Sequence, residues 1–284
     1  MSISVEASGQ ACGATVRGVD LADGLDPTTV ADIRQAWLEH HVLAIPDQDL
    51  DDAALERFTL AFGPFGVDPF IEAIEGHPHV IALHRPADET ATIFADSWHA
   101  DWSFQAHPPD GTCLYGRIIP PVGGDTLFID QQAALAAMPI ELRDRIEGAV
   151  AVHSARAGYS PDGLYGDADD GSARATRIVV SDEAYATQTH PLVRTHPETG
   201  VESLYGCIGY ICGIEGMSDD EATELLLDLY RWQTRDEFQY RHRWEPHMLV
   251  MWDNRCVLHK ATGGYDGHER LLHRTTIGYN PAVR

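Results

Sequence analysis

The chain has 284 residues and a formal net charge of -24 at pH 7, which excludes the basic footprint that nucleic acids and anionic membrane surfaces require. Its five cysteines are widely spread and form no Cys-x-x-Cys pair, so the composition excludes a disulfide framework and a zinc finger and favours a reducing cytoplasm. No apolar run reaches the roughly 20 residues that span a bilayer, so a membrane protein is not expected.

The first part of the chain is predicted to alternate strands and helices. Short strands with a glycine turn occupy the first twenty residues. Asp26-Pro27 opens a helix, because Asp is a good N-cap and Pro is tolerated at the first helical position. An apolar strand follows at Val42 to Ile45, and an amphipathic helix at Asp51 to Phe62. Further strands are predicted at residues 79–84, 112–119 and 126–130.

The remainder of the chain is predicted to be richer in strand. A helix is expected over residues 131–147 and a strand over 149–154. Residues 156–185 have no clear hydrophobic period, and a stretch of that length is expected to be an active-site lid or a mobile insertion. Ser218 and Glu221 form a capping box that opens another helix. The last strands are predicted at residues 238–244, 247–252 and 271–279.

These elements predict a mainly β fold with flanking helices (α+β). We see no internal repeat and no linker, so residues 1–284 are expected to form a single domain. A β-rich body with helices packed outside is typical of a double-stranded β-helix, or jelly-roll, core.

One histidine and one aspartate form the first part of a candidate metal site. His99 and Asp101 are two residues apart, and on a strand such residues point to the same face. His259, delivered from a distant strand, would complete a set of two imidazoles and one carboxylate. This set leaves the opposite coordination positions open, as in non-haem Fe(II) oxygenases. The pair alone is weak evidence, since a buried histidine with a carboxylate partner gives the same pattern and the chain holds 15 His and 44 acidic residues.

Four segments in a fixed order strengthen this interpretation: WHADWSF from residue 98, GGDT from residue 123, MWDNRCVLH from residue 251 and ERLLHRTT from residue 269. Their order resembles the taurine and 2,4-dichlorophenoxyacetate dioxygenases, the TauD/TfdA family, over roughly residues 12 to 281. The resemblance implies a jelly-roll oxidoreductase that uses Fe(II), 2-oxoglutarate and O2, and a homo-oligomer, either a dimer or a tetramer.

The resemblance also implies a role for each matching residue. His99, Asp101 and His259 would bind the iron. Arg270 would bind the distal carboxylate of 2-oxoglutarate and Thr126 would hydrogen-bond the same cosubstrate. The alternative for Arg270 is an exposed ion pair with Glu269, and for GGDT a plain turn entering a strand.

Arg274 lies four residues after Arg270, so on a strand both guanidinium groups can enter one cavity. In the family this second arginine contacts either the cosubstrate or the anionic head group of the substrate, and the choice stays open here.

The implied reaction hydroxylates an unactivated C–H bond of a small organic substrate carrying a carboxylate, sulfonate or similar anion, and releases succinate and CO2. A carbon that bears a heteroatom would then lose its C–O, C–S or C–N bond. Taurine-specific members have a His and a Tyr where this chain has residues 68–73, DPFIEA, so the resemblance argues against taurine. Aromatic candidates for a substrate pocket, or for ordinary core, are Phe70, Tyr159, Tyr205 and Tyr210.

Two other classes of function stay open from the sequence. One is a jelly-roll protein that binds a metal or a small molecule without turnover. The other is a Zn or Mn enzyme that uses the same three ligands, although such an enzyme has no need of a 2-oxoglutarate clamp.

Overall fold

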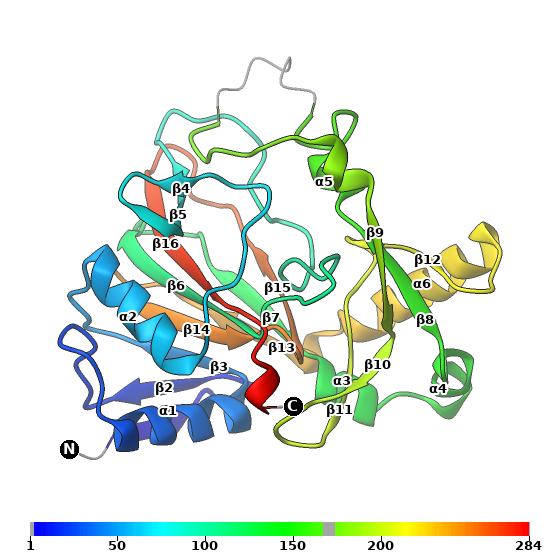
Figure 1. Ribbon diagram of the computed structural model, residues 1–284, viewed down its shortest axis with the longest axis horizontal. Coiled ribbons are helices and arrows are strands. Elements are labelled where there is room, and N and C mark those ends of the chain that lie inside the picture. Colours follow the sequence, from blue (N-terminus) through cyan, green and yellow to red (C-terminus); the bar gives the residue numbers. More distant parts are fainter. Residues whose placement is uncertain (1–2, 167–173, 284) are drawn as a thin grey trace.

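The computed structural model describes residues 3–166 and 174–283 and arranges their strands in one large sheet, two three-stranded sheets and a hairpin (Figure 1). The large sheet has, in spatial order, β1 (Ser4–Ala7), β2 (Ala14–Arg17), β3 (Val42–Ile45), β14 (Leu249–Asp253), β6 (Gly111–Ile118), β16 (Arg270–Ile277), β5 (His77–Arg85) and β4 (Ala73–Ile74). Its neighbours pair antiparallel, except that β2 and β3 are parallel.

The smaller sheets come from the middle and the end of the chain. They are β13 (Gln239–His242), β7 (Thr126–Asp130) and β15 (Val257–Ala261); β12 (Ile211–Ile214), β8 (Val150–Ser154) and β9 (Thr187–Pro191); and the hairpin β10 (Val193–Thr195) and β11 (Glu202–Leu204). The helices are α1 (Pro27–His40), α2 (Asp52–Phe62), α3 (Gln131–Ala136), α4 (Ile140–Ile146), α5 (Arg156–Tyr159) and α6 (Asp219–Gln233), with 3-10 turns η2 (Asp182–Tyr185), η3 (Asp236–Phe238) and η4 (Pro281–Val283).

The inner face of the large sheet packs on the β13–β7–β15 sheet. Phe128 of β7 lies against Trp252 of β14, with ring centroids 5.5 Å apart, and Leu114 of β6 and Leu272 of β16 belong to the same buried cluster. Because each strand alternates its side chains, the two facing antiparallel sheets share one apolar layer. This confirms the predicted double-stranded β-helix core with flanking helices.

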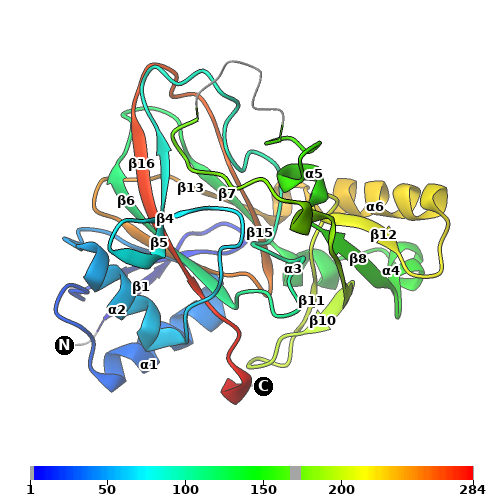
Figure 2. The same cartoon turned by 45° about the horizontal axis from the view of Figure 1, so that its top comes forward.

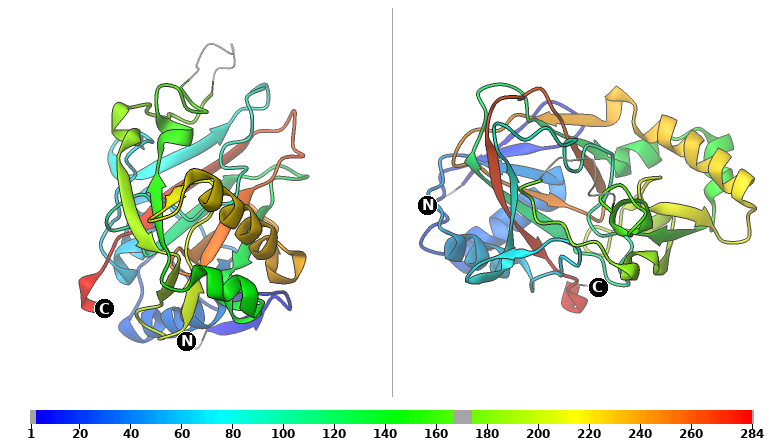
Figure 3. Two further views of the ribbon diagram at one scale, coloured as in Figure 1. Left: turned by 90° about the vertical axis from the view of Figure 1, so that its right-hand side faces the viewer. Right: turned by 90° about the horizontal axis from the view of Figure 1, so that it is seen from above.

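Helices cover the outer faces of this core. On the large sheet, Trp37 of α1 packs edge-on against Phe62 of α2, with ring centroids 6.3 Å apart, and both are buried. At the opposite end α6 packs near β12 and α3, so helices stand on both sides of the strands (Figure 3). Figure 2 shows β16 between these layers, beside β5 and β6. No helix of the described ranges is long and apolar enough to cross a membrane.

Most predicted element boundaries agree with the structure within a few residues. The segment 131–147 is helical as predicted, but it forms two helices, because the chain breaks into α3 and α4 around Met138-Pro139. Proline lacks the backbone N–H and disfavours helical geometry in the residue before it, so the first helix ends there. The predicted capping box is present: Ser218 Oγ accepts from the Glu221 amide, and the Glu221 carboxylate accepts from the Ser218 amide.

The segment 156–185 is only partly described. It begins with α5 and ends with η2, while residues 167–173 lie outside the described residues. The expectation that this segment is a lid therefore stays a prediction.

Candidate active site

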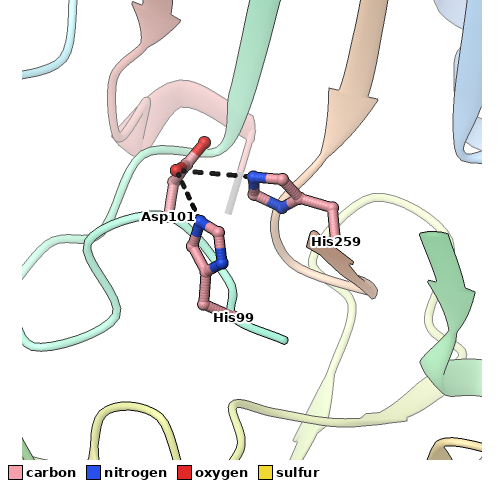
Figure 4. A group of neighbouring side chains, drawn as sticks. All are labelled: His99, Asp101 and His259. Atoms are coloured by element: carbon pink, nitrogen blue, oxygen red, sulfur yellow. Dashed lines mark ion pairs between the residues drawn. The ribbon is translucent and has the colours of Figure 1, made fainter. Parts of the chain in front are cut away.

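A single antiparallel bridge at the edge of the β13–β7–β15 sheet brings His99 and His259 together. The His99 amide donates to the His259 carbonyl at 3.0 Å, and the His259 amide donates back at 2.8 Å. Two residues that exchange both hydrogen bonds carry their side chains on the same face. The imidazole centroids are 4.2 Å apart, and both rings point towards Asp101 (Figure 4).

Asp101 reaches the histidines through a turn and not through a strand. His99 is an isolated bridge residue, and the turn begins at Asp101 and includes Trp102, which has a φ of 48°. The predicted strand geometry for His99 and Asp101 is therefore wrong, although the predicted convergence of their side chains is present. A left-handed conformation costs about 1 kcal/mol or more in a residue such as tryptophan. The burial of Trp102 and a hydrogen bond from its Nε1 to Asp68 Oδ1 at 2.8 Å hold it there.

A chain of hydrogen bonds fixes the Asp101 carboxylate. Oδ1 lies 3.7 Å from Nε2 of both His99 and His259, while Oδ2 accepts from Thr112 Oγ1 at 2.6 Å. Thr112 in turn accepts from Asn254 Nδ2, and Asn254 Oδ1 accepts from Trp252 Nε1, both at 2.9 Å. These contacts hold one carboxylate oxygen towards the histidines and the other towards β6.

All three side chains favour the deprotonated state that a bound cation requires. Burial raises the pKa of Asp101, but Arg274 and the two histidines outweigh it and bring the pKa to about 2. Burial lowers the pKa of His259 to about 3 and also lowers the pKa of His99. His99 Nδ1 lies 2.8 Å from the Ser97 carbonyl, so Nδ1 carries the proton and the lone pair of Nε2 faces Asp101.

The donor set fits a transition metal such as Fe(II). One ligand atom from each of His99, Asp101 and His259 lies within 4.8 Å of the others. Two imidazoles and one carboxylate suit Fe(II) and leave room for further ligands.

A second cluster, His196, Asp253 and Cys256, is equally close but does not suit a metal. Arg255 already donates to both carboxylate oxygens of Asp253, at 2.7 and 2.6 Å. Burial raises the pKa of the Cys256 thiol well above its usual value, which keeps the thiol protonated. We interpret this cluster as a buried ion-pair network.

The other predicted residues meet around one cavity between the two sheets. Its wall includes His99, His259, Thr126, Arg270 and Arg274. Asp101 lies directly behind, in contact with Arg274 Nη1 at 3.4 Å.

Arg270 lies in this cavity, and no carboxylate of residues 3–166 or 174–283 pairs with it. Its Nη2 donates to the Gly124 carbonyl at 3.2 Å, and its Nε is buried without a hydrogen-bond partner among the described residues. The guanidinium lies near the rings of Trp244 and Tyr265, at 6.0 and 5.8 Å from their centroids. Burial lowers the pKa of Arg270 to about 10. The predicted alternative, an exposed pair with Glu269, is wrong because Arg270 is buried and Glu269 contacts His84.

Thr126 lies on β7 across the cavity from the large sheet. It is buried, and its hydroxyl oxygen accepts from Trp244 Nε1 at 3.0 Å. The hydroxyl proton is therefore free to donate to another acceptor.

Arg274 lines the same cavity as Arg270, as their four-residue spacing on β16 predicts. Its surroundings differ, because it forms ion pairs with Asp68 and Asp101 and its guanidinium lies 5.1 Å from the centroid of the Trp102 ring. Nearby carboxylates, with Asp68 the stronger, outweigh burial and raise the pKa of Arg274.

A second cavity adjoins His99. Tyr159, Tyr165 and Tyr210 line it, and the Tyr210 ring meets the His99 imidazole edge-on with centroids 6.1 Å apart. Of the other aromatic candidates, Phe70 stacks behind Tyr159 in the core, while Tyr205 packs against His153 and His190 outside the lining of this cavity.

The family model described as "Taurine catabolism dioxygenase TauD, TfdA family" matches residues 4–276. The chain belongs to this family.

Curated relatives cover nearly the whole TauD/TfdA chain. An (S)-phenoxypropionate/alpha-ketoglutarate-dioxygenase from Sphingobium herbicidovorans is 32% identical, over 95% of this chain and 93% of the relative. An alpha-ketoglutarate-dependent sulfate ester dioxygenase from Pseudomonas putida is also 32% identical, over 93% of this chain and 86% of the relative. The crystal structure of a taurine dioxygenase from Burkholderia xenovorans superposes with a TM-score of 0.80 at 30% identity, covering 100% of this chain and 95% of that one.

Several residues around the TauD/TfdA site were not predicted from the sequence. Trp244 and Tyr265 flank Arg270, and Asp68 pairs with Arg274. Asn254 lies inside the recognised segment MWDNRCVLH, so its position in that segment was the available signal. Asp68 lies outside the four segments, and its only signal was its place in the segment 68–73, where taurine-specific members have a His and a Tyr.

Proposed function

We propose that this protein is an Fe(II)- and 2-oxoglutarate-dependent dioxygenase that hydroxylates a C–H bond of a small anionic organic substrate and releases succinate and CO2. The proposal rests on one arrangement. His99, Asp101 and His259 converge on a cavity that also holds the buried guanidinium of Arg270, which has no carboxylate partner in the described part of the chain.

Nε2 of His99, Oδ1 of Asp101 and Nε2 of His259 would hold the iron. Bound Fe(II) supplies the redox chemistry that lets O2 attack an unactivated C–H bond. The protein orients and protects this chemistry: Thr112 and Ser97 fix the ligand side chains through hydrogen bonds at 2.6 and 2.8 Å.

Arg270 would hold the distal carboxylate of 2-oxoglutarate. A buried guanidinium without a counter-ion is costly, and a carboxylate that enters the cavity removes this cost. The Thr126 hydroxyl would donate a second hydrogen bond to the same molecule. Trp244 and Tyr265 shield the guanidinium from water, which strengthens the ion pair.

The primary substrate would occupy the tyrosine-lined cavity beside His99. The named relatives act on a phenoxypropionate and on sulfate esters, which supports a carboxylate, sulfate or sulfonate group on this substrate. Hydroxylation at a carbon bearing a heteroatom would be followed by cleavage of the C–O, C–S or C–N bond.

The organisation of the chain around this site is part of the same proposal. Residues 1–284 would act as one domain within a homo-oligomer, and the free cysteines suit a reducing compartment such as the cytoplasm. Ala157, Leu164 and Tyr165 line the substrate cavity, which supports a covering role for the described part of residues 156–185. Limited proteolysis with and without ligands tests that role, since a cover must become resistant when ligands bind.

The decisive experiment is anaerobic. Fe(II) and then 2-oxoglutarate are added to the apo protein, and the visible absorption of the Fe(II)–2-oxoglutarate chelate is recorded. We expect the band in the wild type and its loss in His99→Ala and, at limiting cosubstrate, in Arg270→Ala. A folded, iron-loaded wild type without the band would contradict the proposal.

A further inference from the structure

Asp68 is a buried carboxylate outside the four recognised segments, and it opens the segment 68–73 in which taurine-specific members have a His and a Tyr. It lies in the loop between α2 and β4, and its side chain is 9% exposed. Three donors converge on it: Arg274 Nη2 in a short contact, Trp102 Nε1 at 2.8 Å and Thr276 Oγ1 at 3.4 Å. Two of these donors come from β16 and the third from the turn that carries Asp101.

These contacts use one edge of the Arg274 guanidinium before any substrate arrives. Nη2 contacts Asp68, Nη1 contacts Asp101 at 3.4 Å, and Nε is buried without a partner in the described ranges. One cation therefore faces two carboxylates. A substrate anion that approached Arg274 would meet the field of Asp68 and would compete with it for the same donors.

Arg274 lies in the wall of the cavity that also holds Arg270, next to the tyrosine-lined substrate cavity. Among the described residues the lining of the substrate cavity is aromatic, small or apolar apart from His99 and Ser97, and it contains neither arginine nor lysine. Arg174 lies in the wall of the same cavity as Arg274, 5.3 Å from the centroid of the Tyr165 ring, and donates hydrogen bonds to Thr92. Arg274 contacts Asp101 at 3.4 Å, so its charge acts on a substrate group that binds beside the metal ligands.

Resting on the function proposed above, we propose that Asp68 is a specificity-determining residue. Its carboxylate neutralises Arg274 and lowers the affinity of the site for anionic substrate groups relative to uncharged groups of the same shape. Asp68 thus sets how strongly the enzyme discriminates between an acid and its neutral analogue.

The test compares one acid with its primary amide. Calorimetry under anaerobic conditions, on enzyme loaded with Fe(II) and 2-oxoglutarate, measures the Kd of (S)-2-phenoxypropionate and of its amide. Asp68→Asn keeps the size of the side chain and an acceptor for Trp102, but removes the charge. We expect the ratio of acid to amide affinity to rise about tenfold, because a hydrogen bond to a charged group gains at least that much.

Three variants serve as controls. Asp52→Asn removes a carboxylate that pairs with Arg117 and His273, and it should leave the ratio unchanged, since His273 is next to Arg274 on β16 but contacts α2 outside the cavity. Asp68→Glu keeps the charge and should also keep the wild-type ratio. In Arg274→Met/Asp68→Asn the gain of Asp68→Asn should disappear, which assigns the effect to the pair.

Several results would overturn the assignment. An unchanged ratio in Asp68→Asn, weaker binding of the acid, or failure of both wild type and Asp68→Asn to bind the acid would make Asp68 a brace for Trp102 and nothing more. These outcomes differ from failure of the proposed function, which would show as the absence of the 2-oxoglutarate band and of succinate release in the wild type.

Discussion

The two arginines of β16 face one cavity but have opposite electrostatic surroundings. Arg270 is buried among Gly124, Trp244 and Tyr265, and burial lowers its pKa to about 10. Arg274, four residues further along β16, has two carboxylate partners and a raised pKa. A buried charge without a partner is unfavourable until an anion arrives, whereas a paired charge is already satisfied. We therefore expect an anion to bind at the Arg270 end of the cavity, whereas at the Arg274 end the guanidinium already pairs with Asp68 and Asp101.

The largest expected effect concerns Asp101, which belongs to both the ligand set and the Arg274 end. Asp101→Asn removes the negative charge that a metal cation and Arg274 share, and we expect loss of tight Fe(II) binding and of succinate formation. Metal analysis after gel filtration and a succinate assay measure both. Asp110→Asn, another buried aspartate outside the ligand set, is the control and should retain iron. Tight iron binding by Asp101→Asn would contradict the ligand assignment.

The next prediction compares the stability of the two arginine variants. Arg274→Met leaves Asp68 and Asp101 buried without their cation, so the free energy of unfolding of the apo protein should fall by about 3 kcal/mol. Arg270→Met removes a charge that pairs with no carboxylate in the described part of the chain, and it should change stability little or raise it. Urea denaturation of both variants measures the difference. If both variants lost the same free energy of unfolding, the proposed difference between the surroundings of the two arginines would be wrong.

The affinity for 2-oxoglutarate should also differ between the two arginine variants, and here Arg270→Met should have the larger effect. Arg270→Met loses a charge-assisted bidentate pair, which is worth about 3 kcal/mol or roughly a hundredfold in Kd. The measurement is an anaerobic titration of the visible band with 2-oxoglutarate. A larger loss in Arg274→Met would instead place the cosubstrate at the Arg274 end, the choice that the sequence left open.

The smallest expected effect is on the pH dependence of the free energy of unfolding, through His242, which lies near Arg270. Burial lowers the pKa of His242 to about 4 from its usual 6.5. As the pH falls below about 6.5 the unfolded chain binds a proton that the folded His242 does not, so stability decreases until the pH approaches 4. Between about pH 7.5 and pH 5 the wild type should therefore lose about 2 kcal/mol more than His242→Gln in urea denaturation. If the stability of the wild type and of His242→Gln changed equally with pH, His242 would be protonated in the folded protein. It would then add a second positive charge beside Arg270.

The sequence predicted regular elements best where local rules act alone. The helix opened by Asp26 and the capping box at Ser218 depend on neighbouring residues, and both are present. The prediction of one continuous helix over 131–147 is wrong, because it followed the apolar spacing of the segment and not the local effect of Pro139. His99 and Asp101 were placed on a strand that does not exist, since a turn with an unusual φ at Trp102 depends on burial and on a partner far along the chain.

By itself the sequence determined the family, the six candidate site residues and the donor types that they offer. Residue types and spacing within short segments carry this information, because two side chains on one strand or turn have few relative positions. Only the tertiary structure decided which arginine is already neutralised. Asp68 and Arg274 are 206 positions apart, and no local pattern encodes a pair that exists only when the loop after α2 packs over β16. The electrostatics of a buried site follow from such distant contacts, since burial makes each charge depend on whatever partner the fold brings to it.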